Sequence, residues 1–374
     1  MHKVIHSDKV KIALQDRGWS QKKLATERAV TPQSVTNWLK GDDFPRPEKL
    51  LKLATTLKLS FSDLVRLPDQ VQPVIAFRKK GAAITTDAHI NKAMAMGALL
   101  RLIVEHLTEM RALRVQLPSP TTQYEALQAI ATEIRNHIGL GTQAVLSYEH
   151  LIKEFNMNGA VIVPVMWGEV QNHKNALHIL LPQEKVTFIF LNLDTRLEDV
   201  KFWMAHALAH VYTPELAGQD VGEDFADALA GALLFPRAVA EHAYGKAAAH
   251  QLAQSQIKEL LQFAKEHSIS LFSVFCEVQR YAEALSLPPL KCQEQDIHAV
   301  RNYIRGKLVS ESLFNPAPPE PAAYIAAAQN IFDSEFFVAL QKMIKSRGVG
   351  PSYLQQAMDI PMKDAILLHG ELSR

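Results

Sequence analysis

The sequence predicts a mainly α-helical protein with a small β-sheet. This α+β fold comprises a short all-α N-terminal domain, a larger domain that contains the sheet, and a helical C-terminal region. Three observations support the prediction. Apolar residues recur with helical spacing along much of the chain. Short helical patterns before residue 67 are separated by turn and capping residues. Three runs rich in β-branched and aromatic residues follow one another between residues 161 and 193 as VIVPVMW, ALHILL and TFIFLNL.

Length and composition are those of an ordinary globular protein. The chain has 374 residues, 48% of them hydrophobic, and a formal net charge of +1. It is long enough for two or three domains. No stretch reaches eighteen consecutive apolar residues, and the segment MHKVIHSDKV lacks the apolar core of a signal peptide. We therefore expect a cytoplasmic protein with no membrane partner.

The near-neutral total charge conceals a basic N-terminal region. Residues 1–66 contain thirteen Lys and Arg against seven Asp and Glu, a net charge of +6, so the rest of the chain carries −5 of the total +1. A basic first domain on a mildly acidic body points to a polyanionic partner for the first domain alone.

The first 66 residues contain short helical patterns with clear ends. Ser20 and Thr31 are suited to helix N-caps, Pro32 to a first helical position, and Gly18 and Gly41 to C-terminal caps. The stretch WSQKKLATERAVTPQSVTNWLKG resembles the helix-turn-helix of the Xre/lambda-repressor-like family. The resemblance covers about sixty residues and gives packing positions to Leu24, Ala25, Val30, Val35 and Trp38.

That resemblance implies binding to an operator in double-stranded DNA. In such a motif the N-terminal part of the second helix enters the major groove, so the base edges are within reach of Gln33, Ser34, Thr36 and Asn37. Phosphates are within reach of Gln21, Lys22 and Lys40. We expect a homodimer, because a single such domain reads too few base pairs for useful specificity. The alternative is a small helical bundle that contacts other proteins.

The next region is interpreted as a connection between domains. PDQVQP, residues 68–73, reads as a linker, and Arg78, Lys79 and Lys80 form a second basic cluster. An amphipathic pattern from Asp87 to Arg114 predicts one helix of more than twenty residues, which serves as a spacer or dimer seam or packs on the following domain. The predicted divisions of the chain are 1–67, 68–119, 120–290 and 291–374.

A second motif has the spacing of metal ligands. His206 and His210 are four apart in an apolar helical run, which places both imidazoles on one helix face. Thirteen residues later, Glu223 opens another helical pattern. Two histidines and one glutamate, with a fourth position left for water, are a usual ligand set of catalytic zinc in peptidases. The spacing alone is also met by two ordinary, partly buried histidines.

The flanking residues resemble a known family. HALAH followed by EDFADALAGALLFP is similar to the ImmA/IrrE metallopeptidases, and the similarity covers roughly residues 120–285. The resemblance implies a zincin-like domain with one Zn²⁺ per chain, held by His206, His210 and Glu223. Asp227, one helical turn from Glu223, is then an acceptor for a ligating imidazole N–H. In that family the peptidase cleaves a helix-turn-helix repressor in a stress response or a mobile-element or defence switch; cleavage of this chain near residues 68–84 is an alternative.

One position departs from the family pattern. The glutamate that serves as general base in the H-E-x-x-H signature is replaced by Ala207. The chain is therefore expected to be catalytically impaired. Ala207 is explained either by a natural pseudo-peptidase that uses its metal site as a sensor or by a Glu→Ala change that traps an inactive form. The otherwise complete motif favours the second explanation. A further alternative for the whole chain is the DNA-binding antitoxin or immunity component of a two-protein module.

The C-terminal region is predicted to be helical. AKEHSISLFSVFCEVQRY resembles the closing segment of the ImmA/IrrE family, a serine-capped helix, and residues 323–345 read as one helix. In SYLQQAMDIPMKDAILLHG, apolar residues repeat the spacing of the N-terminal motif at Leu354, Ile360, Ala365 and Leu368. This segment is poor in basic residues, so we interpret it as a degenerate helix-turn-helix that serves packing.

Overall fold

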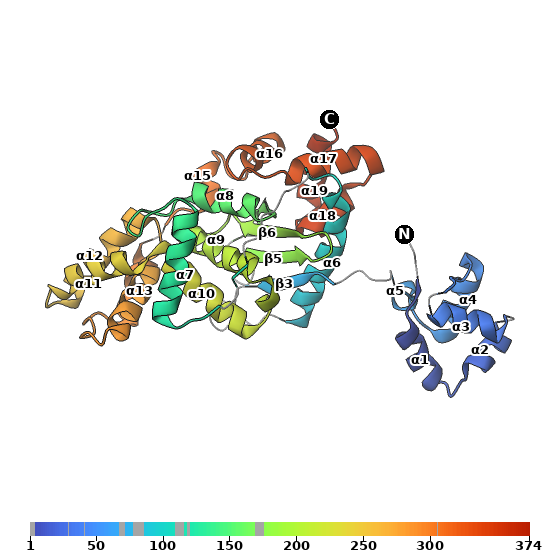
Figure 1. Ribbon diagram of the computed structural model, residues 1–374. Helices are drawn as coiled ribbons and strands as arrows, with labels where there is room; N and C mark the ends of the chain where they lie inside the picture. The colour runs from blue at the N-terminus through green and yellow to red at the C-terminus, as the bar shows by residue number, and fades with distance from the viewer. Residues whose placement is uncertain are drawn as a thin grey trace. The chain divides into compact units, whose positions relative to one another are not determined.

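The computed structural model describes residues 4–28, 30–40, 42–66, 72–77, 86–108, 116–117, 120–168, 176–304 and 306–374. The chain divides into two compact units, Met1–Val71 and Gln72–Arg374. Each unit has a hydrophobic core of its own. Figure 1 shows the helices and strands of both units. The finer predicted divisions at residues 119 and 290 stay predictions. None of the described helices is long and apolar enough to span a membrane.

The N-terminal unit consists of short helices around a small core. Their bounds are α1 Ser7–Gln15, α2 Gln21–Glu27, α3 Pro32–Lys40, α4 Pro47–Leu57 and α5 Phe61–Leu64. The predicted caps at Ser20 and Thr31 are confirmed: the Ser20 hydroxyl accepts the Lys23 N–H at 3.1 Å, and the Thr31 hydroxyl accepts the Ser34 N–H at 3.1 Å. Gly18 adopts φ +60°, as its predicted capping role requires. Gly41 lies outside the described residues.

A two-residue strand at each end of this unit was not predicted. Strand β1, Val4–Ile5, pairs antiparallel with β2, Val65–Arg66. The pairing brings the start of the unit to its end, next to α5.

The larger unit is built on a mixed sheet. Its strands are β3 Val74–Phe77, β4 Ala160–Val165, β5 Ala176–Leu181 and β6 Val186–Asn192. They lie in the order β3-β5-β6-β4. The β3–β5 and β5–β6 pairs are antiparallel, and β4–β6 is parallel. The three strands expected from sequence are confirmed as β4, β5 and β6, whereas β3 was not predicted and begins directly after the expected linker.

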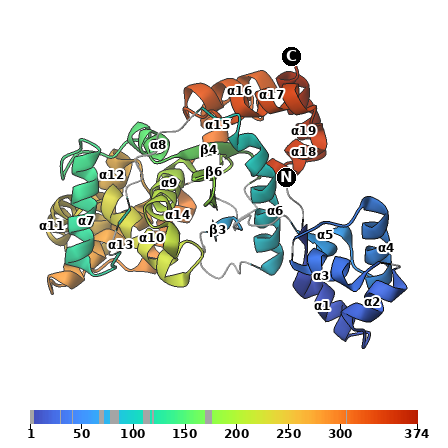
Figure 2. The same ribbon diagram turned by 45° about the vertical axis from the view of Figure 1, so that its right-hand side comes forward.

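Helices cover both faces of this sheet. Successive residues of a strand point to opposite faces. On β5, Ile179 faces helix α6, Asp87–Val104, where a Cβ on Gly97 would lie 3.1 Å from its side chain. His178 faces the opposite helix α9, Leu197–Tyr212, with its ring centroid 5.8 Å from that of His210. The sheet therefore separates α6 from α9, as Figure 2 shows.

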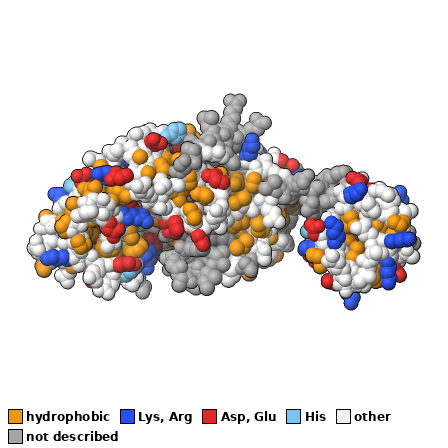
Figure 3. Space-filling view, turned by 60° about the horizontal axis from the view of Figure 1, so that its bottom comes forward, with side chains coloured by type: hydrophobic (Ala, Val, Ile, Leu, Met, Phe, Trp, Pro, Cys, Tyr) orange, Lys and Arg blue, Asp and Glu red, His pale blue; other side chains and the backbone are white. Residues whose placement is uncertain are grey.

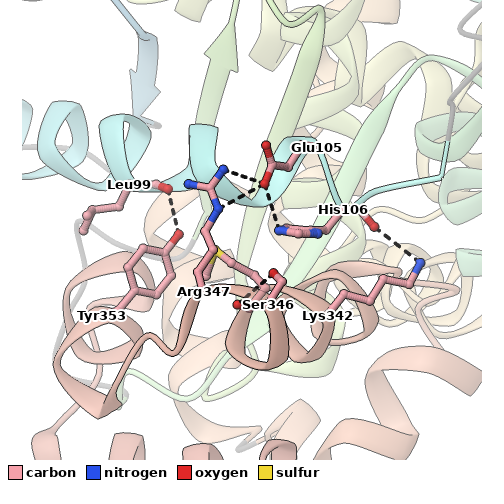
Figure 4. Close-up of polar contacts among 8 residues, drawn as sticks. Leu99, Glu105, His106, Lys342, Ser346, Arg347 and Tyr353 are labelled. Carbon is pink, nitrogen blue, oxygen red and sulfur yellow. Dashed lines mark hydrogen bonds and ion pairs between the residues drawn. The ribbon is translucent and has the colours of Figure 1, made fainter. Parts of the chain in front are cut away.

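The expected helix from Asp87 to Arg114 is wrong in length, because α6 ends at Val104. Immediately after it, the Thr108 N–H bonds to the Glu335 carboxylate at 2.9 Å. Arg347 pairs with Glu105, as Figure 4 shows. These contacts turn the chain onto helix α17, Phe336–Arg347. The apolar stripe of α6 packs in the core of its own unit through Ala93, Met96, Leu100 and Ile103, which is the packing alternative rather than an exposed spacer. Met110, Leu113 and Arg114 lie outside the described residues.

The remaining elements enclose the sheet and α9. They are α7 Tyr124–His137, α8 Tyr148–Met157, η1 Pro214–Leu216, α10 Asp220–Leu234, α11 Arg237–Ala248, α12 Ala253–His267, α13 Leu271–Ala284, α14 Glu294–Tyr303, α15 Val309–Leu313, α16 Pro321–Asn330, α18 Pro351–Met358 and α19 Met362–Leu372. The predicted serine-capped helix is confirmed as α13, since the Ser270 hydroxyl accepts the Ser273 N–H.

The single helix expected over residues 323–345 is wrong. The chain breaks between α16 and α17, where Asp333 adopts φ +48° and accepts a bond from Asn156 at 2.7 Å. The neighbouring Ser334 hydroxyl donates to the Ile162 carbonyl on β4. Tertiary bonds to the sheet therefore override the local helical pattern. Downstream, α18 and α19 bury Leu354, Ala365 and Leu368, in keeping with a packing role for this segment.

Candidate metal centre and nucleic-acid interface

Helix α9 carries two histidines one turn apart. The helix is apolar on nearly all sides and lies in the core, and its first turn contains Glu198 and Asp199, which suit a helix N-terminus. His206 and His210 are 2% and 1% exposed. Their Nε2 atoms approach to 3.1 Å. Both imidazoles therefore face one point inside the larger unit.

Helix α10 brings two carboxylates to the same point. Glu223 lies in its first turn, with Oε2 3.4 Å from His206 Nε2 and Oε1 3.3 Å from His210 Nε2. One turn further, Asp227 Oδ1 lies 2.9 Å from His206 Nδ1. His206, His210 and Glu223 form one cluster whose donor atoms lie within 4.8 Å of one another.

The position of α10 depends on close contacts at both of its ends. At the N-terminal end, a Cβ on Gly222 would lie 2.1 Å from the Leu216 carbonyl oxygen, so only glycine allows η1 to approach. At the C-terminal end, buried Arg135 of α7 donates to the Leu233 carbonyl at 2.6 Å. The guanidinium satisfies a carbonyl that the end of a helix leaves without a partner.

The charges of the cluster influence one another. Burial disfavours the ionised form of Glu223, but the two imidazoles outweigh burial and lower its pKa to about 2. Burial also opposes the charged form of His206, yet its bonds to Asp227 and Glu223 raise its pKa overall. For His210, burial dominates and lowers the pKa. The result is a buried carboxylate facing imidazoles of unlike proton affinity.

Sequence reasoning missed His178. It lies on β5, 3% exposed, with its ring directed toward His210. Neither of its ring nitrogens has a hydrogen-bond partner within the described parts of the chain. Burial is the main reason that its pKa lies well below the usual histidine value. The available signal was a histidine inside the otherwise apolar run ALHILL.

Ala207 follows the first histidine and is 2% exposed. Its methyl group cannot accept a proton, so no proton acceptor stands at the position that the sequence pattern reserves for the base.

In the N-terminal unit, α2 and α3 form a helix pair with a buried side and an open side. Val35 and Trp38 of α3 enter the core, as do Leu24 and Ala25 of α2. Gln33 is exposed on α3, and its side-chain amide donates to Asn37 at 2.7 Å. Ser34, Thr36 and Asn37 are partly exposed. Of these predicted contact residues, Thr36 bonds back to the Pro32 carbonyl at 3.0 Å.

Comparison with protein families identifies this pair. A helix-turn-helix family model matches residues 10–64. Residues 10–64 form a helix-turn-helix domain. The chain therefore contains the DNA-binding part of a transcription regulator. No curated protein and no solved structure matches the chain.

The surface of the helix-turn-helix domain suits a phosphate backbone. Gln21, Lys22 and Lys40, the predicted phosphate contacts, are all exposed. Lys and Arg side chains are distributed over the face of this domain seen in Figure 3. Lys23 lies over the ring of Trp19 at 5.4 Å. The exposed cations and the open side of α3 are the features that duplex DNA requires.

Proposed function

We propose that this chain is a DNA-binding transcription regulator whose larger unit holds one Zn²⁺ through His206, His210 and Glu223 in a peptidase-like site. The observation that carries the proposal is the convergence of three ligand side chains on one point. Ligand atoms of a tetrahedral zinc with bonds of about 2.0–2.1 Å lie roughly 3.3 Å from one another. The two Nε2 atoms are 3.1 Å apart, His210 Nε2 is 3.3 Å from Glu223 Oε1, and His206 Nε2 is 3.4 Å from Glu223 Oε2, so each imidazole faces one oxygen of the carboxylate.

The surroundings of the cluster support the same proposal. Asp227 accepts from His206 Nδ1, so the lone pair of a neutral His206 is on Nε2 and faces the cluster. Glu223 is ionised at neutral pH because its pKa is about 2. Its two oxygens face the two imidazoles at 3.4 and 3.3 Å. A divalent cation would compensate this buried charge.

The site fits a zinc peptidase that lacks its base. A zinc ion bound there would polarise a peptide carbonyl as a Lewis acid and lower the pKa of a water molecule, which could then attack the carbonyl carbon as a base takes its proton. The protein residues would hold the ion and, through Asp227, orient His206. Ala207 can take no proton, and the loss of such a proton transfer slows a reaction by roughly 10²–10⁴-fold. The resemblance to ImmA/IrrE peptidases suggests a helix-turn-helix repressor, or this chain, as the substrate.

Metal analysis tests the ligand set. We expect about one zinc per chain, and its loss on His210→Ala, because two ligands cannot hold the ion as tightly as three. His298→Ala is a matched control, since His298 is a surface histidine paired with Glu294. A preparation that stays metal-free after incubation with zinc would contradict the proposal.

Restoring the base tests the reaction. A glutamate at position 207 would directly follow a metal ligand, so Ala207→Glu should cleave a helix-turn-helix protein or the segment 68–84 of this chain. Cleavage is followed by mass spectrometry, and a chelator should abolish it. The Ala207 form should bind the same target without cutting it.

DNA binding is tested separately. Affinity for an operator duplex should fall steeply with salt, because exposed cations displace counterions from the phosphates. Asn37→Ala or Gln33→Ala should reduce the preference for the operator more than the affinity for unrelated DNA. An operator affinity that does not change with salt, together with an operator preference that neither substitution reduces, would be incompatible with this assignment.

A second candidate function is a metal sensor that never cuts. Ala207 itself favours it, because a sensor needs the ligands but no general base. The Ala207→Glu experiment separates the two candidates: a variant that folds, holds zinc and leaves every candidate substrate intact would replace the peptidase with the sensor.

A further inference from the structure

Strand β3 occupies the edge of the sheet beside the metal cluster. It runs antiparallel to β5, with Val74 opposite Leu180, Ile75 opposite Ile179 and Ala76 opposite His178. Without β3, the main-chain groups on that side of β5 would have no partner in the sheet. Such an edge is where an extended peptide adds by main-chain hydrogen bonds.

The register places Ala76 of β3 opposite His178, whose ring lies beside that of the proposed ligand His210. Directly opposed residues of an antiparallel pair point to the same face of the sheet. Ala76 therefore shares the face of His178, whose ring lies 5.8 Å from that of His210. Ala76 is only 2% exposed, so this face of β3 is covered.

The other side of β3 meets the segment that leads into α10. A Cβ on Gly218 would lie 2.7 Å from the Ile75 carbonyl oxygen, and Gly218 precedes the ligand Glu223 by five residues. Gly218 also adopts φ +78°, which favours glycine. Strand β3 thus lies between β5 and the connection that carries the third ligand.

One further contact fixes the start of the segment. A Cβ on Gly97 of α6 would lie 2.7 Å from two ring carbons of Pro73. Pro73 is buried, and its fixed φ favours an extended chain at this point. The segment is therefore held at Pro73, at Ile75 and along β5.

We propose that residues 72–77 occupy the strand position that a peptide substrate would take at the zinc site, so that the chain blocks its own peptide-binding edge. The proposal rests on the proposed function and adds its regulation. A second peptide binds only after β3 leaves β5. The preferred ligand is an extended segment with a small residue where Ala76 faces His178.

Peptide binding to the full chain tests this. The probe is a fluorescent synthetic peptide with the sequence VQPVIAFR of residues 71–78, followed by fluorescence anisotropy. Ala76→Pro removes an N–H and adds a ring at a covered position, so β3 should detach. We expect this variant to bind the peptide at least tenfold more tightly than the unchanged chain. In the double variant Val74→Cys/Leu180→Cys, oxidation links β3 to β5 through a disulfide between two opposed residues, so this variant should not bind the peptide.

A second pair of variants guards against misfolding. If circular dichroism shows that Ala76→Pro unfolds, Gly218→Ala takes its place, because the added methyl group would collide with the Ile75 carbonyl. Gly139→Ala is the matched control: Gly139 adopts φ +84°, but an added Cβ meets nothing within 4 Å. Two results would overturn the proposal. One is a folded Ala76→Pro or Gly218→Ala variant that binds the peptide no better than the unchanged chain. The other is an oxidised double cysteine variant that binds the peptide as tightly as Ala76→Pro does.

The zinc content of the same preparations separates the two proposals. Zinc-free chains whose peptide binding still depends on β3 would refute the metal site and keep the blocked edge. Chains that hold zinc but whose peptide binding does not change in the β3 variants would support the metal site and refute the blocked edge.

Discussion

At His178, a buried imidazole faces the cluster of His206, His210 and Glu223 with both ring nitrogens unpaired among the described residues. A buried polar group without a hydrogen bond costs about 1–3 kcal/mol. We therefore predict that His178→Leu raises the free energy of unfolding of the metal-free protein by about 1 kcal/mol or more, measured by urea denaturation. Ile179→Leu, on the opposite face of β5, is the control and should give no gain. A destabilised His178→Leu protein would show that the imidazole has a partner in solution.

At the scale of elements, the contact between α10 and α13 buries an acid. Glu277 Oε1 would lie 2.0 Å from a Cβ on Gly231 of α10. Burial raises the pKa of Glu277 to about 7, although Arg280 opposes the shift. Between about pH 4.5 and 7, the unfolded chain therefore releases a proton that the folded chain keeps, and the free energy of unfolding falls as pH rises.

Glu277→Gln removes this titration. It should have little effect below pH 4.5 and should stabilise the protein above pH 7 by on the order of 1–3 kcal/mol. Thermal unfolding across this pH range measures the difference. Glu283→Gln, an exposed position on the same helix, should not change the pH profile. A constant effect of Glu277→Gln from pH 4 to pH 8 would contradict the assignment.

The contact between α7 and α10 depends on Arg135. Its guanidinium donates to the carbonyls of Leu233, Gly141 and Ala144. Arg135→Met keeps the apolar stem but leaves these acceptors unpaired, and we predict a loss of about 3 kcal/mol or more in unfolding free energy. Arg237→Met removes a surface pair with Glu125 and should cost less than about 1 kcal/mol. Equal losses in the two variants, measured by denaturant titration, would rule out this role for Arg135.

At the scale of the molecule, the two units have separate cores. We predict two unfolding transitions in calorimetry, because a separate hydrophobic core allows each unit to unfold by itself. A ligand stabilises only the folded unit that binds it. Chelation of zinc should therefore lower the transition of residues 72–374 and leave that of the helix-turn-helix domain unchanged. A single transition that shifts as a whole would contradict this.

The parts that could be predicted from sequence depend on local patterns. The caps at Ser20 and Thr31, the helix pair of the helix-turn-helix domain and three strands follow from spacing and residue type. The His206–His210 pair follows from the period of one helix. Glu223 was named as the third ligand from its place at the start of the next helical pattern and from a family resemblance. Its approach to the pair depends on the packing of α10 on α9, which local spacing does not fix.

The parts that could not be predicted depend on distant partners. Strand β3 is four residues long, and its pairing with β5 joins segments about a hundred residues apart. The end of α6 is set by Arg347 and Glu335, and the break before α17 by Asn156 and the Ile162 carbonyl. His178 has no partner in sequence that would mark it. Its position becomes informative only once β5 is placed against α9.

Because β3 is part of the same chain as the edge that it covers, it also determines how strongly a free peptide must bind to replace it. Strand β3 competes with a free peptide as an intramolecular ligand, whose effective concentration is on the order of millimolar. A free peptide that made only the same contacts would need to reach roughly that concentration to displace it. Short random peptides at lower concentrations would therefore be excluded. A partner with additional contacts elsewhere on the larger unit could still enter.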